Sequence, residues 1–201
     1  MYKLTYSPAS PYVRKVMLAA YSIKINHEID LVSSENKFFQ DFKSKNPLSK
    51  IPILMTPNGD YLFDSRVIID YFNRLEGSLI PIEGKERDIV MTKCALTEGI
   101  IDAALLYVYS NRYAGDSKPS KIWQELQISK IKHSLMSLNQ NVSNWEILTK
   151  VNASHIGLIV ALDYLNFRNI FNWEKDMKHL LEWHEKSKLV VPGYVETLPK
   201  D

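Results

Sequence analysis

The sequence predicts an α+β protein with a mixed first part and a second part built only from helices. Over residues 1–76, short apolar runs are interrupted by Pro and Gly, which is typical of short strands, turns and helices. Over residues 85–201, apolar side chains recur at every third or fourth position, which is typical of amphipathic helices. We therefore expect an N-terminal β-α-β-α-β-β-α domain, a linker over residues 77–84, and an all-α helical-bundle domain.

The first half of the N-terminal domain reads as strand, helix, strand, helix. We expect strands over residues 3–6 and 27–32, and helices over residues 11–21 and 35–45. The first helix should begin at Ser10-Pro11, because Ser is a good N-cap and Pro fits the first helical position. The second helix carries Phe38, Phe39 and Phe42 at helical spacing.

The second half of this domain should form a hairpin and a third helix. We expect strands over residues 51–55 and 61–63, joined by a turn at Pro57-Asn58-Gly59-Asp60. A helix then starts at Asp64-Ser65 and stops at Gly77, since Gly is the usual residue after a helix end. The turn residues that follow favour a linker before the helical domain.

The helical domain is predicted to hold four helices, over residues 85–112, 119–141, 152–166 and 175–186. The third of them is apolar on almost every side, so we expect it at the centre of the bundle. Asn152 occupies its N-cap position, and His155 stands where a capping box has a carboxylate. A neutral imidazole can accept one backbone N–H but is a poorer partner, so we expect His155→Asp to raise the melting temperature.

Composition and charge exclude several classes of protein. Among the 201 residues, 45% are apolar and 24% charged, and 25 Lys and Arg are scattered among 23 Asp and Glu. Such a chain is globular and lacks the basic clusters of a nucleic-acid-binding protein. It also lacks a signal peptide and the roughly 18 consecutive apolar residues of a membrane span. We expect a cytoplasmic protein without nucleic-acid or membrane partners.

Cysteine and histidine usage predicts no disulfide and no metal site. Cys94 is the one cysteine, and we interpret it as a buried structural thiol rather than a reactive one. His179 and His184 are five residues apart, which does not match the three- or four-residue spacing of paired ligands on a helix. We expect no metal cofactor.

Three motifs together resemble the cytosolic glutathione S-transferases, in particular bacterial members with a serine in the N-terminal motif. They are YSPASPYVRKV at 6–16, NPLSKIPIL at 46–54 and the Asp64-Ser65 pair, and NASHIGLIVALDYLNFR at 152–168 is similar to the central helix of that family. The resemblance covers nearly the whole chain. It implies that the N-terminal domain is thioredoxin-like and that glutathione is the cosubstrate, with no metal or organic prosthetic group.

The resemblance also assigns glutathione-binding roles. It implies a cis bond before Pro52, main-chain contacts from Ile51, and a Lys50 ammonium that pairs with the glycine carboxylate. It places Asp64 beside the γ-glutamyl end of the ligand. Independently of the family, the free N–H groups at the start of a helix suit an anion, so Ser65 could hold the γ-glutamyl carboxylate. The plainer alternatives are an edge strand at Pro52, a solvated Lys50 and a simple Asp-Ser cap.

A glutathione transferase must convert a thiol into a thiolate, and a serine in the first loop is the candidate for this role. At the start of the first helix, the hydroxyl of Ser10 and the helix dipole would both favour negative charge on sulfur. Ser10 could instead serve only as the helix cap. Ser7 is the rival catalytic candidate and Tyr6 a weaker one. The loop has no cysteine, so disulfide-exchange chemistry is disfavoured.

The second substrate, a small apolar electrophile, would lie against the first long helix of the helical domain. Tyr109 and Tyr113 are four residues apart and share one face of that helix, whereas Tyr107 points elsewhere. Tyr12 is a further candidate for this pocket.

The leading hypothesis is therefore a glutathione S-transferase, expected as a homodimer from the resemblance. The alternative is a glutathione-transferase-like protein-interaction module without transferase activity, as in the stringent starvation proteins. The retained Lys50, Ile51-Pro52 and Asp64-Ser65 favour a binding site over a pure scaffold.

Overall fold

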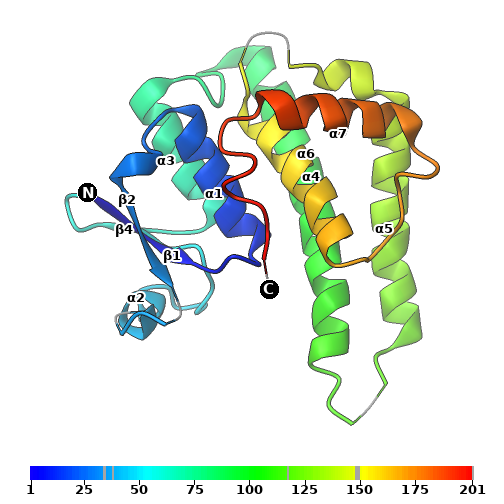
Figure 1. Ribbon diagram of the computed structural model, residues 1–201, viewed down its shortest axis with the longest axis horizontal. Helices are drawn as coiled ribbons and strands as arrows, with labels where there is room; N and C mark the ends of the chain where they lie inside the picture. Colours follow the sequence, from blue (N-terminus) through cyan, green and yellow to red (C-terminus); the bar gives the residue numbers. More distant parts are fainter. Residues whose placement is uncertain (34, 38, 117, 148–149, 201) are drawn as a thin grey trace.

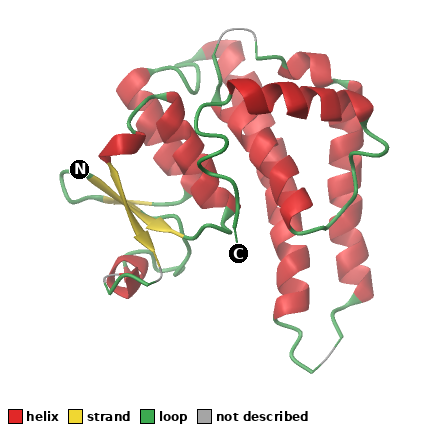
Figure 2. Ribbon diagram, viewed as in Figure 1, coloured by secondary structure: helices red, strands yellow, loops and turns green. Residues whose placement is uncertain are grey.

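The computed structural model describes residues 1–33, 35–37, 39–116, 118–147 and 150–200, and confirms the predicted α+β class. One four-stranded sheet lies in the N-terminal part, and helices make up the remainder, as Figure 2 shows in yellow and red. The strands are β1 (Tyr2–Tyr6), β2 (Ile29–Ser33), β3 (Leu54–Met55) and β4 (Tyr61–Leu62). Their spatial order is β2-β1-β3-β4, with β1 and β2 parallel and the other pairs antiparallel.

Three helices accompany the sheet: α1 (Pro11–Ser22), α2 (Phe39–Ser44) and α3 (Ser65–Glu76). Helices α1 and α3 pack together on one side of the sheet, and α2 lies on the other side (Figure 1). As predicted, Ser10 is the N-cap of α1, Pro11 is its first residue, and α3 ends at Gly77 with a φ of 68°.

Several predicted boundaries are wrong in the N-terminal domain. The strand expected over 51–55 is reduced to Leu54–Met55, because the Ile53 N–H binds the Thr5 hydroxyl instead of a main-chain carbonyl. The strand expected from His27 starts at Ile29, since Asn26–Glu28 form a 3-10 turn. The helix expected over 35–45 covers Phe39–Ser44, and Phe38 lies outside the described residues.

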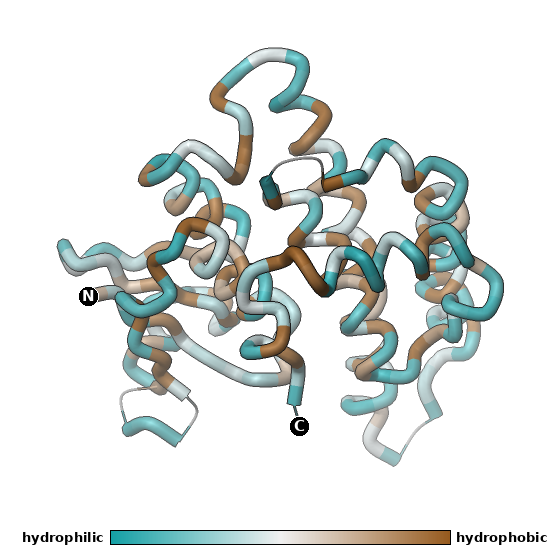
Figure 3. Tube along the Cα trace, turned by 45° about the horizontal axis from the view of Figure 1, so that its top comes forward, coloured by the Kyte–Doolittle hydropathy of each residue, from teal (hydrophilic) through white to brown (hydrophobic). Residues whose placement is uncertain are grey.

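The helical part contains α4 (Gly84–Arg112), α5 (Lys121–Gln140), α6 (Ala153–Phe167) and α7 (Lys178–Val190), close to the predicted ranges. Brown and teal alternate along most of the helices in Figure 3, as amphipathic helices require. Helix α6 differs because all its residues from Ala153 to Leu165 are buried, which confirms its predicted central place. Domain boundaries at 76 and 85 stay a prediction.

Helix α6 packs closely on α4 through Gly157. A Cβ atom at Gly157 would lie 2.3 Å from Oγ1 of Thr97, so a side chain larger than hydrogen would push the helices apart. Helix α6 also packs against α1, which joins the helical part to the sheet-containing part. The central helix therefore contacts both halves of the molecule.

A buried polar cluster holds α1 against α6. Nη1 of Arg14 lies 2.6 Å from Oδ2 of Asp163, and both residues are almost inaccessible, at 4% and 7% exposure. Nε2 of His184 on α7 lies 2.7 Å from Oδ1 of the same carboxylate, and the Tyr194 hydroxyl donates to it over 3.2 Å. A buried charge is tolerated only when it is paired and hydrogen-bonded, and Asp163 meets both conditions.

The N-terminus of α6 has a complete capping box. Oδ1 of Asn152 accepts from the backbone N–H groups of Ser154 and His155, and Nδ1 of His155 accepts from the backbone N–H of Asn152 over 3.2 Å. The imidazole therefore accepts the backbone N–H that a carboxylate usually accepts in such a box. This acceptor role needs an unprotonated Nδ1, and burial, with the nearby Lys93 charge, lowers the pKa of His155 to about 4.

We expect the stability of the protein to depend on the protonation of His155. The folded pKa is about 4 and the unfolded value about 6.5, so the unfolded state binds more protons between these values. Stability should therefore fall as the pH drops through 6.5, by about 2 kcal/mol between pH 8 and pH 5, or about 5 °C in Tm. Thermal denaturation of wild type, His155→Gln and His155→Asp over this range measures the effect.

The two variants lack this titration, so His155→Asp should gain most over wild type at pH 5 and little at pH 8. A wild-type Tm that falls no more steeply than that of His155→Gln would contradict the assigned protonation state.

Candidate functional site

The two candidate catalytic serines lie at the ends of one tight turn. The Ser10 backbone N–H donates to the Ser7 carbonyl over 3.1 Å, with Pro8 and Ala9 at the corner of the turn. Oγ of Ser10 accepts from the Val13 backbone N–H over 3.3 Å, as expected of an N-cap. A hydroxyl that accepts one bond still has its own proton to donate. Capping α1 and donating to a ligand are thus compatible roles for Ser10.

The segment with Lys50, Ile51 and Pro52 leads into Ile53, which bonds to Thr5 of β1, two residues before the Ser7–Ser10 turn. The Ile51–Pro52 bond is cis, as the resemblance implied. Directly after it, Ile53 bonds to Thr5: the Thr5 N–H donates to the Ile53 carbonyl over 3.0 Å, and the Ile53 N–H donates to Thr5 Oγ1 over 2.7 Å. Pro52 is buried, Ile51 half-buried and Lys50 exposed.

A residue that the sequence analysis missed shapes this segment. The buried side chain of Asn46 donates to the Lys50 carbonyl over 2.9 Å and accepts from the Leu48 N–H over 3.0 Å. It therefore fixes the loop that presents Lys50 and Ile51. Asn is common in turns, but the sequence alone does not show that the Asn46 amide binds the carbonyl of Lys50, four residues later.

Helix α3 begins with a cap and a buried hydroxyl side by side. Oδ1 of Asp64 accepts from the Arg66 backbone N–H over 3.0 Å, and the Arg66 guanidinium binds both carboxylate oxygens, at 3.2 and 2.7 Å. These hydrogen bonds from Arg66 lower the pKa of Asp64. Ser65 is fully buried, and its Oγ has no hydrogen-bond partner within the described part of the chain. A second cis bond joins Phe63 to Asp64.

The Ser65 hydroxyl is unusual because buried polar groups nearly always have a partner. It sits at the first position of a 12-residue helix, where backbone N–H groups are free and the dipole favours an anion. A carboxylate bound there would supply the missing acceptor.

Helix α4 faces α1 with a row of polar side chains. The Tyr12 hydroxyl donates to Oδ1 of Asp102, and burial together with this bond raises the pKa of Tyr12. One turn earlier on α4, Glu98 forms an ion pair with the buried Lys15 of α1. Sequence reasoning missed Lys15, Glu98 and Asp102, because their pairing joins residues about 85 positions apart.

The tyrosines assigned to the second-substrate pocket are only partly brought together. Tyr109 and Tyr113 form an edge-to-face pair with ring centroids 5.3 Å apart, and they are 38% and 71% exposed. Tyr109 is seven residues beyond Asp102, so it lies two turns along the same face of α4. Tyr12 is held against that face through Asp102. The structure thus pairs Tyr109 with Tyr113 and holds Tyr12 against Asp102, two turns earlier on α4.

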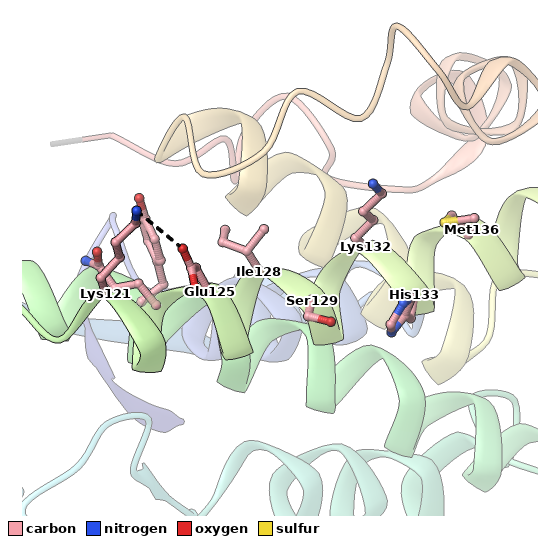
Figure 4. Close-up of a pocket in the computed structure, with 9 residues that line it drawn as sticks. Lys121, Glu125, Ile128, Ser129, Lys132, His133 and Met136 are labelled. Carbon is pink, nitrogen blue, oxygen red and sulfur yellow. Dashed lines mark ion pairs between the residues drawn. The ribbon is translucent and has the colours of Figure 1, made fainter.

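A groove on the described surface lies away from the predicted glutathione-binding residues. It has a volume of about 690 Å³ and runs along α5, with Tyr107 of α4 as a further wall (Figure 4). None of the residues predicted to bind glutathione lines it. Tyr107 indeed points away from the Tyr109 face. The groove is mostly flanked by solvated side chains such as Lys121, Glu125 and Lys132.

Cys94 and His184 have the surroundings of structural residues. Burial raises the pKa of the Cys94 thiol to about 11, which disfavours the reactive thiolate. His184 is held in the polar cluster around Asp163. Among the described residues, no three His, Cys, Asp or Glu side chains are placed to hold a metal ion, and no helix is long and apolar enough to cross a membrane.

Comparison with known proteins identifies the family. Residues 4–78 match the family model "Glutathione S-transferase, N-terminal domain". The chain is 30% identical over 187 residues to the uncharacterized GST-like protein YibF of Escherichia coli K12, over 90% of each chain.

Solved structures are also similar. A glutathione transferase family member from Pseudomonas fluorescens Pf-5 with bound glutathione has 31% identity and a TM-score of 0.89, over 100% of both chains. A glutathione S-transferase from Methylobacillus flagellatus KT with GSH bound has 28% identity and a TM-score of 0.87, again over 100% of both chains. Together with the motifs at the turn, the cis-proline and α3, these matches mean that the chain belongs to the glutathione S-transferase family of enzymes.

Proposed function

We propose that this protein binds glutathione and activates its thiol with Ser10 for attack on a small apolar electrophile. The observation that carries the proposal is the buried, unpartnered Oγ of Ser65 at the N-terminus of α3. The γ-glutamyl carboxylate would accept from this hydroxyl and from the free N–H groups of the helix. Relatives with bound glutathione support the same ligand class.

The remaining contacts follow the ligand along the edge of the sheet. Asp64 would meet the γ-glutamyl ammonium with an oxygen lone pair that Arg66 leaves free. The backbone of Ile51, turned by the cis bond at Pro52, would pair with the extended peptide as an added strand does. The exposed Lys50 ammonium would bind the glycine carboxylate. These contacts would direct the thiol toward the turn that carries Ser7 and Ser10.

Ser10 would stabilise the thiolate by donating its hydroxyl proton in a hydrogen bond to sulfur, with the positive end of the α1 dipole behind it. The thiol proton leaves to solvent. The sulfur lone pair then forms a bond to the electrophilic carbon, and either a leaving group departs with its electron pair or the adduct takes up a proton. Holding both reactants in one site makes this step effectively unimolecular.

Two further properties belong to the same proposal. The protein would act in the cytoplasm. A single cysteine is consistent with this, because it cannot form a disulfide within the chain. The electrophile would lie between Tyr12 and the Tyr109 and Tyr113 pair. The reaction could end in conjugation, reduction, dehalogenation or isomerisation, since each uses the same thiolate.

Binding of glutathione tests the carrying observation. We expect reduced glutathione to bind with a Kd in the micromolar to low millimolar range, measured by isothermal titration calorimetry. Ser65→Ala should weaken binding about tenfold or more, because a hydrogen bond to a charged group is lost. Ser129→Ala, in the groove along α5 that no predicted glutathione-binding residue lines, is the matched control and should bind like wild type.

Absence of glutathione binding to the wild type would favour the alternative, a protein-interaction module that keeps the fold without transferase activity.

The pH dependence of activity shows whether Ser10 or Ser7 stabilises the thiolate of glutathione. A free cysteine thiol has a pKa of roughly 8.5, and we expect Ser10→Ala to raise the pKa of bound glutathione by about one unit above that of wild type. Its activity loss should therefore be larger at pH 6.5 than at pH 9, whereas Ser7→Ala should keep the wild-type profile. Titration of thiolate absorbance gives the pKa directly, and melting temperatures account for the lost cap. An equal shift in both variants would count against Ser10.

A homodimer is the expected assembly. Helices α3, α4 and α5 expose large apolar side chains that a second subunit could cover, namely Val67, Leu75, Ile89, Met91 and Leu126. Closed two-fold dimers are the commonest soluble oligomers. Sedimentation equilibrium should give twice the chain mass of 23.3 kDa. A single 23 kDa species at micromolar concentration would contradict the dimer, and Val67→Glu should weaken it.

A further inference from the structure

The segment after α7 follows α1 along its whole length in the opposite direction. In Figure 1 it is the red chain that descends between the two halves of the molecule, beside α1. Gly193 lies against Tyr21 near the end of α1, Thr197 against Arg14 in its second turn, and Lys200 against Pro8 before its start. We call residues 193–200 the strap.

The upstream part of the strap is firmly attached. Gly193 has a φ of 75°, and a Cβ atom there would lie 2.3 Å from the Tyr21 ring, so the close approach requires glycine. The Tyr194 ring lies 5.2 Å from the Arg14 guanidinium, and the Tyr194 hydroxyl donates to Asp163. Oγ1 of Thr197 accepts from Nε of Arg14 over 3.4 Å and donates to the Gly193 carbonyl over 2.8 Å. The strap is thus anchored in the buried cluster between α1 and α6.

The downstream end of the strap reaches the turn that carries the candidate catalytic serines. The Lys200 backbone N–H donates to the Pro8 carbonyl over 3.3 Å. This carbonyl belongs to the central peptide of the Ser7–Ser10 turn, and the orientation of that peptide is what distinguishes type I from type II turns. A donor held on Pro8 therefore selects one orientation and fixes the backbone of Ala9, directly before Ser10.

We propose that the strap is a positioning element for Ser10, which holds the Ser7–Ser10 turn in the one conformation that directs the Ser10 hydroxyl at the ligand sulfur. The inference rests on the proposed function of Ser10 and adds a role for residues that do not touch glutathione. Lys200 acts through its backbone N–H and Thr197 through its hydroxyl. Neither is a catalytic residue.

A pair of substitutions at position 200 separates the backbone contact from the side chain. Lys200→Pro removes the N–H that binds Pro8, whereas Lys200→Ala removes only an exposed ammonium. We expect Lys200→Pro to lower kcat about three- to tenfold and to raise the pKa of the bound thiol, with KM for glutathione changed less than twofold. Lys200→Ala should match wild type in all three. Equal kcat and equal thiol pKa in the two variants would overturn the proposal.

A measurement that does not depend on glutathione tests the same contact. Amide hydrogen exchange of Ser7, Ala9 and Ser10 should be faster in Lys200→Pro than in Lys200→Ala, with exchange in α6 unchanged. Unaltered exchange would overturn the proposed role of the strap, even if the protein is an active transferase. Faster exchange in a protein that fails to bind glutathione would support the hold on the turn and refute only the proposed function.

A second variant guards against misfolding at position 200. Thr197→Val removes the acceptor for Arg14 at nearly constant volume, and Thr197→Ser restores it. We expect Thr197→Val to lower kcat and to raise the pKa of the bound thiol, as Lys200→Pro does. Thr197→Ser should restore both to the wild-type values. Loss with both, accompanied by a lower Tm in both, would indicate a purely structural role.

Discussion

The buried ion pair between Arg14 and Asp163 is the interaction on which the arrangement of the molecule depends. It joins the first helix to the central helix across 149 residues of sequence. Burial by itself would raise the pKa of Asp163, but the hydrogen bond from His184 and the charge of Arg14 outweigh it, and the net effect is a lowered pKa. The carboxylate therefore stays charged and holds donors from α1, α7 and the strap together.

The position of Arg14 links this interaction to the candidate site. Arg14 lies one turn after Ser10, and the Arg14 backbone N–H donates to the Ser10 carbonyl over 3.1 Å. Because Arg14 fixes α1 to α6 close to the start of α1, the N-terminus of α1 is also held in place. Only a few further hydrogen bonds are then needed to fix the Ser7–Ser10 turn that precedes it. The position of Ser65 is supported in the same way, because α3, which begins at Ser65, packs against α1. The two helix N-termini proposed to bind the γ-glutamyl carboxylate and the thiol of glutathione are thus supported by one core.

Local chemistry made a large part of this fold predictable. Ser10-Pro11 and Gly77 mark helix ends in the sequence because caps depend on neighbouring residues only. The cis bond at Pro52 followed from the family resemblance. Strand lengths were overestimated, since an apolar run such as residues 51–55 does not reveal where pairing begins. The contacts of Tyr12 with Asp102 and of Arg14 with Thr197 could not be predicted, because no local pattern specifies partners 90 and 183 positions away.

The raised pKa of Cys94 bears on the proposed reaction, because an electrophilic substrate could also react with the protein's own thiol. At pH 7 a thiol with a pKa of about 11 is ionised in only about one molecule in ten thousand. The sole sulfhydryl of the chain would therefore react far more slowly with an electrophile than an activated glutathione thiolate does. Burial within α4 would thus protect the protein's own sulfur from the electrophiles that we propose as its substrates.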